Sequence, residues 1–516
     1  MKAAAAALAA MVWAGAAMAG PTVHVAEGDV GGVEAGKVES FKGIPFAAPP
    51  VGDLRWRPPQ PAAAWTGVRP ADAFGPICMQ PLNPRFGQFK ASEDCLTLNV
   101  WRPAGAAAGA KLPVMVWIYG GAFIQGASSA PFYDGTRFAE RGVILVSLNY
   151  RLGKFGFFAH PALDGGPGPV ANYGIMDQIA ALKWVQANIA AFGGDPGNVT
   201  VFGESAGAIS VNFLMGSPAA RGLFAKAIAE SGFGRSEPRP LKGDGSAESF
   251  GVAFAEKQGI KGDDAAAAAA LRALPAETLN VPMRLADPGG PGPIADGQVI
   301  TQGIAEAFIK GEEAHVPYLV GGNSYEASLF PQVADFPAPV IARAGPADQV
   351  IAAYGGQPQP EVAREVTTDS MITEPDRLLA RQMAKQGLPA FVYHFSYVPA
   401  AQRATSFGAA HGSEIIYVFQ TLPDRPISFG AYTLPAATAD DQKIAEAMHA
   451  YWVAFAKTGD PDSAGGPLWP RYTLAGDQLL EFGADGVRER DGYAKARLDL
   501  LETAADVRAA ARNGGN

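Results

Sequence analysis

The chain has 516 residues, of which 48% are hydrophobic and 18% are charged, so it is long enough to bury a substantial core. The 50 acidic residues outnumber the 41 basic ones, which gives a formal net charge of -9. This mild acidic excess argues against nucleic acid or an anionic membrane as a standing partner. The composition also excludes the disordered and collagen-like classes.

The N-terminal residues are typical of an export signal. Lys2 is followed by a run of apolar and small residues, and Ala17-Met18-Ala19 fits a small-residue cleavage site. We therefore expect residues 1–19 to be a signal peptide, Gly20 to begin the mature chain, and the protein to be periplasmic or secreted. The alternative is an uncleaved anchor, although the run is short for a bilayer span of about 20 residues. No later stretch is apolar enough to span a membrane, so we expect no stable membrane anchor.

Cys78 and Cys95 are the two cysteines of the sequence. Export would place them in an oxidising compartment, where an intramolecular disulfide is reasonable; two buried free thiols are the alternative. No group of residues has the spacing of a metal site, and we expect neither a metal nor an organic cofactor.

From residue 112 onward, strand-like runs alternate with helical periods. Strands are expected at residues 112–119, 143–150, 199–202, 225–229, 316–321 and 390–397. Apolar residues between Ile175 and Phe192 recur at steps of three and four, which predicts an amphipathic helix that stops at Gly193–Pro196. Residues 206–215 are expected to form another helix. This order predicts a large, mostly parallel sheet with helices on both faces, in one domain over residues 20–516 with inserted helical cap regions.

Gly203-Glu204-Ser205-Ala206-Gly207 is a G-x-S-x-G sequence between an expected strand and an expected helix. This is the context of a nucleophile elbow, in which the serine occupies a sharp, strained turn. Both glycines are needed because side chains at these positions would collide. The start of the helix also favours negative charge nearby. Ser205 is therefore the expected nucleophile of an acyl-transfer reaction, and a simple helix N-cap is the alternative.

Acyl transfer also needs hydrogen-bond donors for the oxyanion. The segment Trp117–Phe123 ends an expected strand in a glycine turn, where backbone N–H groups can point into a cleft. Gly121 and Ala122, together with Ala206 after the nucleophile, are the expected donors. A plain turn at the end of a strand is the alternative.

A histidine is the expected general base, because its pKa lies near neutrality. The sequence has six histidines: His24, His160, His315, His394, His411 and His449. His160 precedes the serine, against the chain order of nucleophile, acid and histidine in such enzymes. His411 lies downstream in a glycine-flanked loop and is the candidate; we expect the remaining four to be structural.

The acid of the triad should lie on a loop between Ser205 and His411. Glu326 follows the strand that is expected to end at Gly321, so it falls at the end of a sheet strand. A buried carboxylate at this point would orient the imidazole. Spacing alone leaves the other acidic residues of this interval open.

Longer segments carry a resemblance that covers residues 22 to about 480. They are Phe41–Ala47, Glu93–Val100, Asn149–Gly153, Asn172–Gly207, Gly412–Glu414, Phe455–Pro461 and Leu468–Pro470. On these motifs the chain resembles the type B carboxylesterases, a family of α/β-hydrolase fold that includes the cholinesterases and bacterial nitrobenzyl esterases. The resemblance implies a hydrolase that needs no cofactor and acts on a small-molecule ester.

Residue by residue, the resemblance implies a specific site. It assigns Ser205, Glu326 and His411 to the triad, Gly121, Ala122 and Ala206 to the oxyanion positions, Cys78 and Cys95 to a disulfide, and Arg55 and Glu93 to an ion pair. Ala122 stands where many members have a third glycine, and Tyr325-Glu326-Ala327 stands where the acid usually lies in Asp-Glu-Gly. Glu204 and Glu414 also lie near the triad in the family, either to tune the histidine or to make structural hydrogen bonds behind it.

The substrate is expected to be an uncharged ester with a short or medium acyl group. The segment between the cysteines contains Phe86 and Phe89 but no tryptophan, unlike the longer aromatic loop of cholinesterases that binds a quaternary ammonium. Phe123 is expected to wall an apolar gorge, and Phe157 and Phe158 either join it or pack in the core. The alternatives are a catalytically weak binding or scavenger protein of the same fold, and an amidase or lipase.

Overall fold

A computed structural model describes residues 20–82, 89–164, 170–283, 289–429 and 432–513. The expected signal peptide, residues 1–19, lies outside the described residues, and so does Phe86. Within these described segments, no helix combines the length and the apolar character needed to cross a bilayer.

A sheet of 11 strands runs through the middle of the molecule. In spatial order its strands are β20 (Gly486–Arg490), β19 (Leu479–Gly483), β16 (Ala390–Phe395), β15 (Tyr318–Asn323), β12 (Lys226–Glu230), β11 (Gly194–Glu204), β9 (Leu112–Ile118), β10 (Ile144–Leu148), β8 (Thr97–Pro103), β4 (Val38–Pro45) and β3 (Val33–Ala35). The strands from β19 to β10 pair in parallel, and antiparallel pairs flank them at both ends. This is the large, mostly parallel sheet that the order of strands and helices predicts.

The central strands are buried on both faces. β9 reads LPVMVWI, and the side chains from Val114 to Ile118 are fully buried. Near-continuous apolar runs of this kind are typical of parallel strands that helices cover on both sides. Trp117 of β9 and Phe202 of β11 pack ring against ring, with centroids 4.7 Å apart. The sheet therefore carries the main hydrophobic core.

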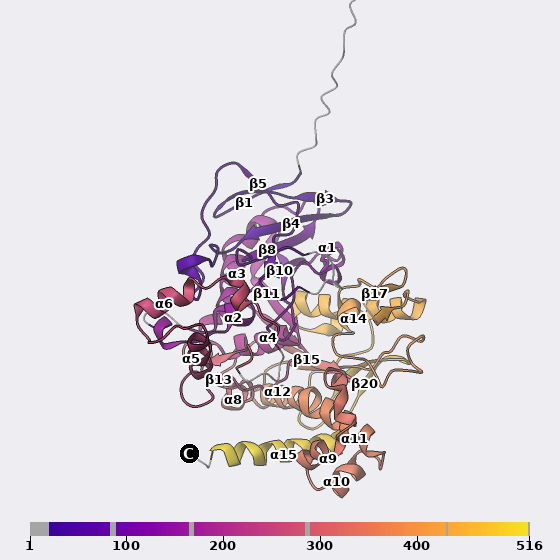
Figure 1. Cartoon of the computed structure of the whole chain (residues 1–516). Helices are drawn as coiled ribbons and strands as arrows, with labels where there is room; N and C mark the ends of the chain where they lie inside the picture. The colour runs from indigo at the N-terminus through magenta and orange to yellow at the C-terminus, as the bar shows by residue number, and fades with distance from the viewer. Residues whose placement is uncertain (1–19, 83–88, 165–169, 284–288, 430–431, 514–516) are drawn as a thin grey trace, which may run out of the picture.

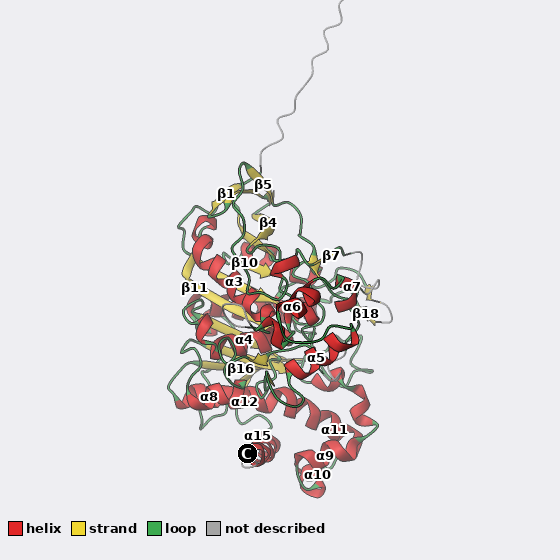
Figure 2. Cartoon of the chain, turned by 60° about the vertical axis from the view of Figure 1, so that its left-hand side comes forward, coloured by secondary structure: helices red, strands yellow, loops and turns green. Residues whose placement is uncertain are grey.

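Helices cover both faces of the sheet. Figure 1 shows α3 on one side of the strands and α14 on the other, and Figure 2 shows α3 and α4 in front of the strands. The helices are α1 (Thr136–Glu140), α2 (Gly153–Gly156), α3 (Tyr173–Asn188), α4 (Ala206–Gly216), α5 (Ala247–Lys257), α6 (Ala265–Arg272), α7 (Ala276–Leu279), α8 (Ile304–Lys310), α9 (Pro337–Ala344), α10 (Ala347–Ala353), α11 (Gln359–Thr368), α12 (Glu374–Lys385), α13 (Ile415–Val418), α14 (Ala439–Thr458) and α15 (Lys495–Asn513).

Smaller elements lie around this core. They are the three-stranded sheet β1 (Thr22–Val25), β2 (Gly28–Gly31) and β5 (Val68–Pro70), and the pairs β6 (Ile77–Cys78) with β7 (Ala91–Ser92), β13 (Arg239–Pro240) with β14 (Ile294–Ala295), and β17 (Ile427–Phe429) with β18 (Tyr432–Leu434). At the end of the molecule opposite β1 and β5, α9, α10 and α11 lie beside α15 (Figure 1) and share a separate apolar cluster that includes Ile341, Val350 and Leu501.

The helix expected over residues 175–192 forms as α3 and a following 3-10 turn, but it is not amphipathic. α3 is buried nearly all round, including Asp177 and Gln178. Asp177 is buried together with Arg151, which it meets through two N···O distances of 2.8 Å, and Gln178 donates to Ser210. The spacing of the apolar residues thus predicts the helix. It does not predict that the face with Asp177 and Gln178 is also buried and that both side chains have polar partners there.

The strand expected at residues 199–202 is longer than its apolar run. β11 already begins at Gly194, and its pairing with β9 is irregular between Gly194 and Val199. Gly193, just before it, has a φ of 89°, a left-handed conformation that glycine adopts without strain. The breaker sequence Gly193–Pro196 therefore ends the helical segment and also starts the strand.

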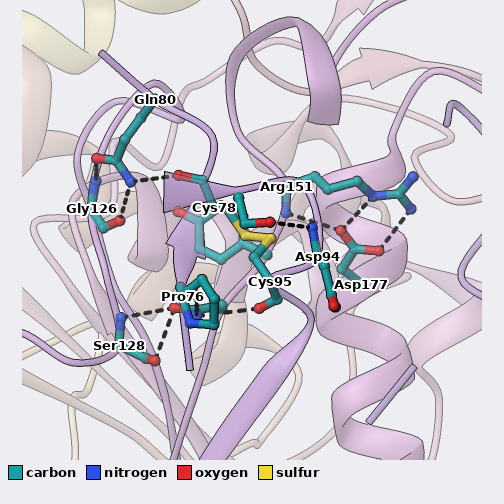
Figure 3. Close-up of a disulfide and its surroundings, with 12 residues drawn as sticks. Pro76, Cys78, Gln80, Asp94, Cys95, Gly126, Ser128, Arg151 and Asp177 are labelled. Carbon is teal, nitrogen blue, oxygen red and sulfur yellow. Dashed lines mark hydrogen bonds and ion pairs between the residues drawn. A yellow bond between two sulfur atoms is a disulfide. The ribbon is translucent and has the colours of Figure 1, made fainter. Parts of the chain in front are cut away.

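A disulfide joins Cys78 and Cys95, and both residues are buried (Figure 3). Beside it, the guanidinium of Arg55 donates to the two carboxylate oxygens of Glu93 at 2.7 and 2.5 Å. Both contacts agree with what the resemblance implies.

Asp376 of α12 is a buried carboxyl group in a small cavity. The cavity has a volume of about 20 Å³, and its lining includes Gly322 of β15 and His394 of β16. Asp376 is 1% exposed, and among the described residues neither of its carboxylate oxygens has a hydrogen-bond partner. Burial, followed by the charges of Glu326 and Glu374, raises the pKa of Asp376 well above its ordinary value. The folded protein therefore keeps this carboxyl protonated to higher pH than the unfolded chain does.

Asp376→Asn is expected to stabilise the protein at neutral pH. The unfolded chain releases the Asp376 proton near pH 4, whereas the folded chain keeps it, so this group lowers the free energy of unfolding of the wild type as the pH rises above about 4. Asparagine has no such proton. The melting temperature of the variant should exceed that of the wild type near pH 8, and the two should converge toward pH 4. A difference that does not change with pH would contradict this expectation.

Candidate active site

The backbone of Ser205 lies in a strained turn between β11 and α4. Its φ of 56° and ψ of -123° lie in a region that residues with side chains rarely adopt. A Cβ on Gly203 would stand 2.5 Å from the carbonyl oxygen of Ile118, and a Cβ on Gly207 only 2.0 Å from the same atom. Both glycines are therefore required for β9, β11 and α4 to meet here. The geometry agrees with the elbow that the motif predicts.

Gly120 is a third point of close approach, which the motif does not reveal. A Cβ at this position would lie 2.9 Å from the Cβ of Ser205 and 2.7 Å from the backbone oxygen of Glu204. The end of β9 therefore passes directly beside the elbow. Any side chain at residue 120 would displace Ser205.

Residues 120–126, called here the 120–126 loop, fold into a tight turn after β9. Gly121, Ala122 and Phe123 all have positive φ, at 109°, 58° and 60°. The amides of Ile124 and Gln125 both donate to the carbonyl oxygen of Gly121 at 3.1 Å. The turn is thus closed by its own backbone and holds two consecutive non-glycine residues in the left-handed region.

Three backbone N–H groups near Ser205 remain available to a ligand. Among the described residues, the amides of Gly121, Ala122 and Ala206 donate to no protein acceptor. The first two belong to the 120–126 loop, and the third belongs to the first residue of α4, whose free amides carry partial positive charge. The positions expected for an oxyanion hole thus have unused donors.

The structure brings Glu326 and His411 together from loops 85 residues apart. Nδ1 of His411 lies 2.5 Å from one carboxylate oxygen of Glu326. The other oxygen accepts hydrogen bonds from Ser231 Oγ at 2.6 Å and from the amide of Asn323 at 2.7 Å. The two loops are also joined by an isolated bridge between Tyr325 and Ala410. The carboxylate therefore has a fixed orientation toward the imidazole.

The opposite edge of the imidazole faces a second carboxylate. Nε2 of His411 lies 3.0 Å from Glu204, the residue immediately before Ser205. Burial disfavours the charged imidazolium, but the charges of Glu204 and Glu326 outweigh it and raise the pKa of His411 to about 10. Burial, partly offset by His411, raises the pKa of Glu204 to about 7. The free site thus favours an imidazolium held between two acidic groups.

Two further buried carboxyl groups lie behind this pair. Burial raises the pKa of Glu414 to about 8, with the charges of Glu204 and Glu326 next in effect, and Glu414 accepts a hydrogen bond from the side chain of Asn323. Burial also raises the pKa of Glu230 well above its ordinary value, and Glu230 accepts from Trp452 at 2.8 Å. Glu204 therefore contacts the histidine itself, whereas Glu414 makes the structural hydrogen bond.

The other five histidines lie elsewhere in the fold. Burial lowers the pKa of both His394 and His449 to about 4, so each is neutral in its packed environment. His160 accepts a backbone hydrogen bond at the start of a 3-10 turn, and burial lowers its pKa. His24 is exposed and pairs with an aspartate, and His315 lies near a backbone carbonyl. His411 is thus the histidine that meets both Glu204 and Glu326.

Aromatic residues flank the site, and Phe233 among them is not signalled by any sequence motif. Its ring lies 6.2 Å from the imidazole of His411, and its φ of 46° is an outlier for a bulky residue. Phe123 packs edge-on against Phe157, while Phe158 stacks on a buried tryptophan. Phe123, Phe157 and Phe158 are all buried, so core packing describes the three rings better than a gorge wall.

A cavity of about 310 Å³ adjoins the outer side of the 120–126 loop. Its lining includes Gln80, Ile124, Gln125, Lys154 and Val281, but neither Ser205 nor His411.

Within the part of the chain that the structure describes, no group of three or more histidine, cysteine or acidic residues is placed to hold a metal ion.

Comparison with known proteins gives the family. Residues 19–339 and 356–501 match the carboxylesterase family. A fumonisin B1 esterase of Sphingopyxis macrogoltabida is 40% identical over 476 residues, which cover 89% of this chain and 86% of that protein. A para-nitrobenzyl esterase of Bacillus subtilis (strain 168) is 34% identical, and the match covers 92% of this chain and 97% of the relative.

Solved structures give the same result. A carboxylesterase of Geobacillus stearothermophilus, 35% identical, matches with a TM-score of 0.79 over 92% of this chain and 99% of that chain. A PNB esterase, 31% identical, matches with a TM-score of 0.80 over 93% of this chain and 99% of that chain. The sheet, the elbow and these similarities lead to one conclusion: the chain belongs to the carboxylesterase family and has the α/β-hydrolase fold.

Proposed function

We propose that the protein cleaves carboxylic esters with Ser205 as nucleophile, His411 as general base and Glu326 as the acid that orients the base. The observation that carries the proposal is the position of His411. Its Nδ1 meets Glu326 at 2.5 Å, and its Nε2 faces Glu204, the neighbour of Ser205. Membership of the carboxylesterase family supports the same assignment.

The proposed reaction is a two-step acyl transfer. Oγ of Ser205 bonds to the ester carbonyl carbon while its proton passes to Nε2 of His411. The carbonyl oxygen becomes an oxyanion, to which the amides of Gly121, Ala122 and Ala206 donate; one such donor is worth roughly 3–4 kcal/mol in the transition state. The alcohol leaves with the proton from His411. Water then attacks the acyl-enzyme by the same route and releases the acid and the free serine.

Glu326 serves the histidine rather than the substrate. Its hydrogen bonds from Ser231 and Asn323 occupy one carboxylate oxygen and leave the other for Nδ1 of His411. A carboxylate in this position favours the Nδ1–H tautomer and stabilises the imidazolium that forms during catalysis.

Glu204 raises the pKa of His411 in the free enzyme. Its charge lies 3.0 Å from Nε2 of His411 and favours a proton on that nitrogen. In the proposed reaction the same nitrogen must be free to accept the proton of Ser205. Loss of this charge, through protonation of Glu204 or through its displacement by substrate, lowers the pKa of His411 and frees Nε2. Glu204 thus links the pH to the fraction of His411 that can act as a base.

The proposed substrates are uncharged esters with short or medium acyl groups. Phe233 supports an apolar acyl group, because its ring lies 6.2 Å from the imidazole of His411. The segment between Cys78 and Cys95 is short and has no tryptophan to bind a quaternary ammonium group.

We also propose export through residues 1–19, followed by a single hydrolase domain that begins at Gly20. The disulfide between Cys78 and Cys95 supports this, because such bonds persist in oxidising compartments.

Ser205→Ala is expected to lower kcat for a nitrophenyl ester by roughly 10⁴–10⁶-fold, because the triad acts as a unit. The melting temperature should change little. An organophosphonate probe should label Ser205 in the wild type, as read by peptide mass spectrometry. Ser210→Ala is the matched control: Ser210 lies in the same helix, and its hydroxyl is bound to the carbonyl oxygen of Ala206 at 2.9 Å. An active Ser205→Ala protein, or labelling at another residue, contradicts the assignment.

Glu204→Gln is expected to move the acid limb of the kcat/KM profile to lower pH. Glu204 raises the pKa of His411, so removal of its charge lets His411 lose its proton at lower pH. The control is Glu414→Gln, whose carboxyl makes its hydrogen bond to Asn323 and should move the limb less. A shift of the limb to higher pH, or equal shifts in the two variants, would refute this role for Glu204.

A substrate series tests the specificity. Nitrophenyl esters from acetate to palmitate are assayed beside a choline ester and an emulsified triglyceride, with fumonisin B1 added because a relative that is 40% identical is named for it. We expect the highest kcat/KM for short or medium acyl chains. The highest value for the choline ester, or for palmitate with activation at an interface, would overturn this preference and leave the triad assignment intact.

A further inference from the structure

Gln80 lies two residues after Cys78, and its side chain is buried. Among the described residues, its side-chain amide is bound to backbone groups (Figure 3). Nε2 donates to the carbonyl oxygens of Gly126 at 2.7 Å and of Cys78 at 3.1 Å, and Oε1 accepts from the amide of Gly126 at 2.9 Å. Because donor and acceptor both meet their complements on one residue, the orientation of the amide is determined by this network.

Gly126 is the point at which the 120–126 loop returns to its own start. It has a φ of 126°, and a Cβ there would lie 2.5 Å from the ring of Tyr119 and 2.7 Å from the carbonyl oxygen of Gly120. Gly126 therefore packs so closely against the end of β9 that a side chain at this position would not fit. Gln80 binds both backbone groups of the residue that closes it.

The loop needs such an anchor because its backbone is strained. Ala122 and Phe123 are consecutive non-glycine residues with positive φ, a conformation that persists only where the surroundings hold it. The amide of Gly153 holds the carbonyl oxygen of Phe123 at 2.8 Å on one side. Gln80 holds the far end, at Gly126.

Gln80 is itself carried by a rigid frame. The disulfide joins Cys78 to Cys95, and the side-chain amide of Asn149 donates to the carbonyl oxygens of Pro76 at 3.1 Å and Cys95 at 3.3 Å. Asn280 donates to the backbone oxygen of Gln80 at 3.2 Å. The frame fixes the starting point from which Gln80 reaches the loop.

We propose that Gln80 is a positioning residue for the reaction, which holds the 120–126 loop so that the amides of Gly121 and Ala122 meet the oxyanion. The proposal rests on the function proposed above and adds a residue that contacts neither substrate nor triad. Without the bonds to Gly126 the strained loop relaxes, and a displacement of about 1 Å at the donors costs on the order of 10²-fold in rate. The loss falls on kcat, because the donors act on charge that develops in the transition state.

Gln80→Met tests this role, because methionine keeps the volume and removes all three hydrogen bonds. We expect kcat to fall roughly 10- to 100-fold with KM within about threefold of the wild type, and the affinity for a trifluoromethyl ketone, which forms a tetrahedral adduct with the nucleophile, to fall with kcat/KM. The control is Gln186→Met. Gln186 donates to the backbone oxygens of Pro196 at 2.8 Å and Leu223 at 3.0 Å, away from the loop, and its loss should leave kcat and ketone affinity unchanged.

Gln80→Glu supplies a second readout. Its carboxylate still accepts from the amide of Gly126 but opposes the carbonyl oxygens of Gly126 and Cys78; its protonated form can again donate. The ratio of kcat in this variant to kcat in the wild type should therefore rise as the pH falls. Lys154 lines the same cavity as Gln80, and its positive charge would lower the pH at which the carboxylate of the variant takes up its proton.

The outcomes separate this inference from the proposed function. A wild type that shows no ester turnover and no probe on Ser205 defeats the proposed function. An active, labelled wild type whose Gln80→Met variant matches Gln186→Met in kcat, KM and ketone affinity overturns the role of Gln80 alone. A Gln80→Glu ratio that stays constant with pH also overturns it.

Discussion

At the carboxyl end of the sheet, β9, β11 and α4 approach one another so closely that no side chain fits between them. A Cβ on Gly207 would stand 2.0 Å from the carbonyl oxygen of Ile118, and a Cβ on Gly120 would stand 2.9 Å from the Cβ of Ser205. This contact keeps Ser205 at a φ of 56° and prevents the turn from relaxing. The strain of the elbow therefore follows from this close approach.

The electrostatic character of the site follows from burial at this edge. Glu204 lies on the elbow and Glu326 on the loop after β15, so their carboxylates reach opposite edges of His411 at 3.0 and 2.5 Å. Burial alone would disfavour the imidazolium, yet the two charges raise the pKa of His411 to about 10. Removal of the charge of Glu204 would lower the pH at which His411 gives up its proton. The elbow thus carries both Ser205, the proposed nucleophile, and Glu204, whose charge raises the pKa of His411.

Local sequence patterns predict part of the fold and part of the site. The alternation of strands and helices predicted the sheet, and the motif around Ser205 predicted a turn that the backbone geometry matches. The pairing of Glu326 with His411 could not come from spacing, because the two meet through a tertiary contact between loops 85 residues apart; the family resemblance supplied it. Phe233 and Gln80 carry no motif, and their positions follow from a strained backbone and from a side chain bonded to a distant turn.

A crystal structure of the protein inactivated by an organophosphonate would measure the position of the oxyanion directly. The phosphorus should be bonded to Oγ of Ser205. The phosphonyl oxygen should lie roughly 2.7–3.1 Å from the amide nitrogens of Gly121, Ala122 and Ala206. An adduct on another residue, or a phosphonyl oxygen that points to solvent away from these three amides, would contradict the account.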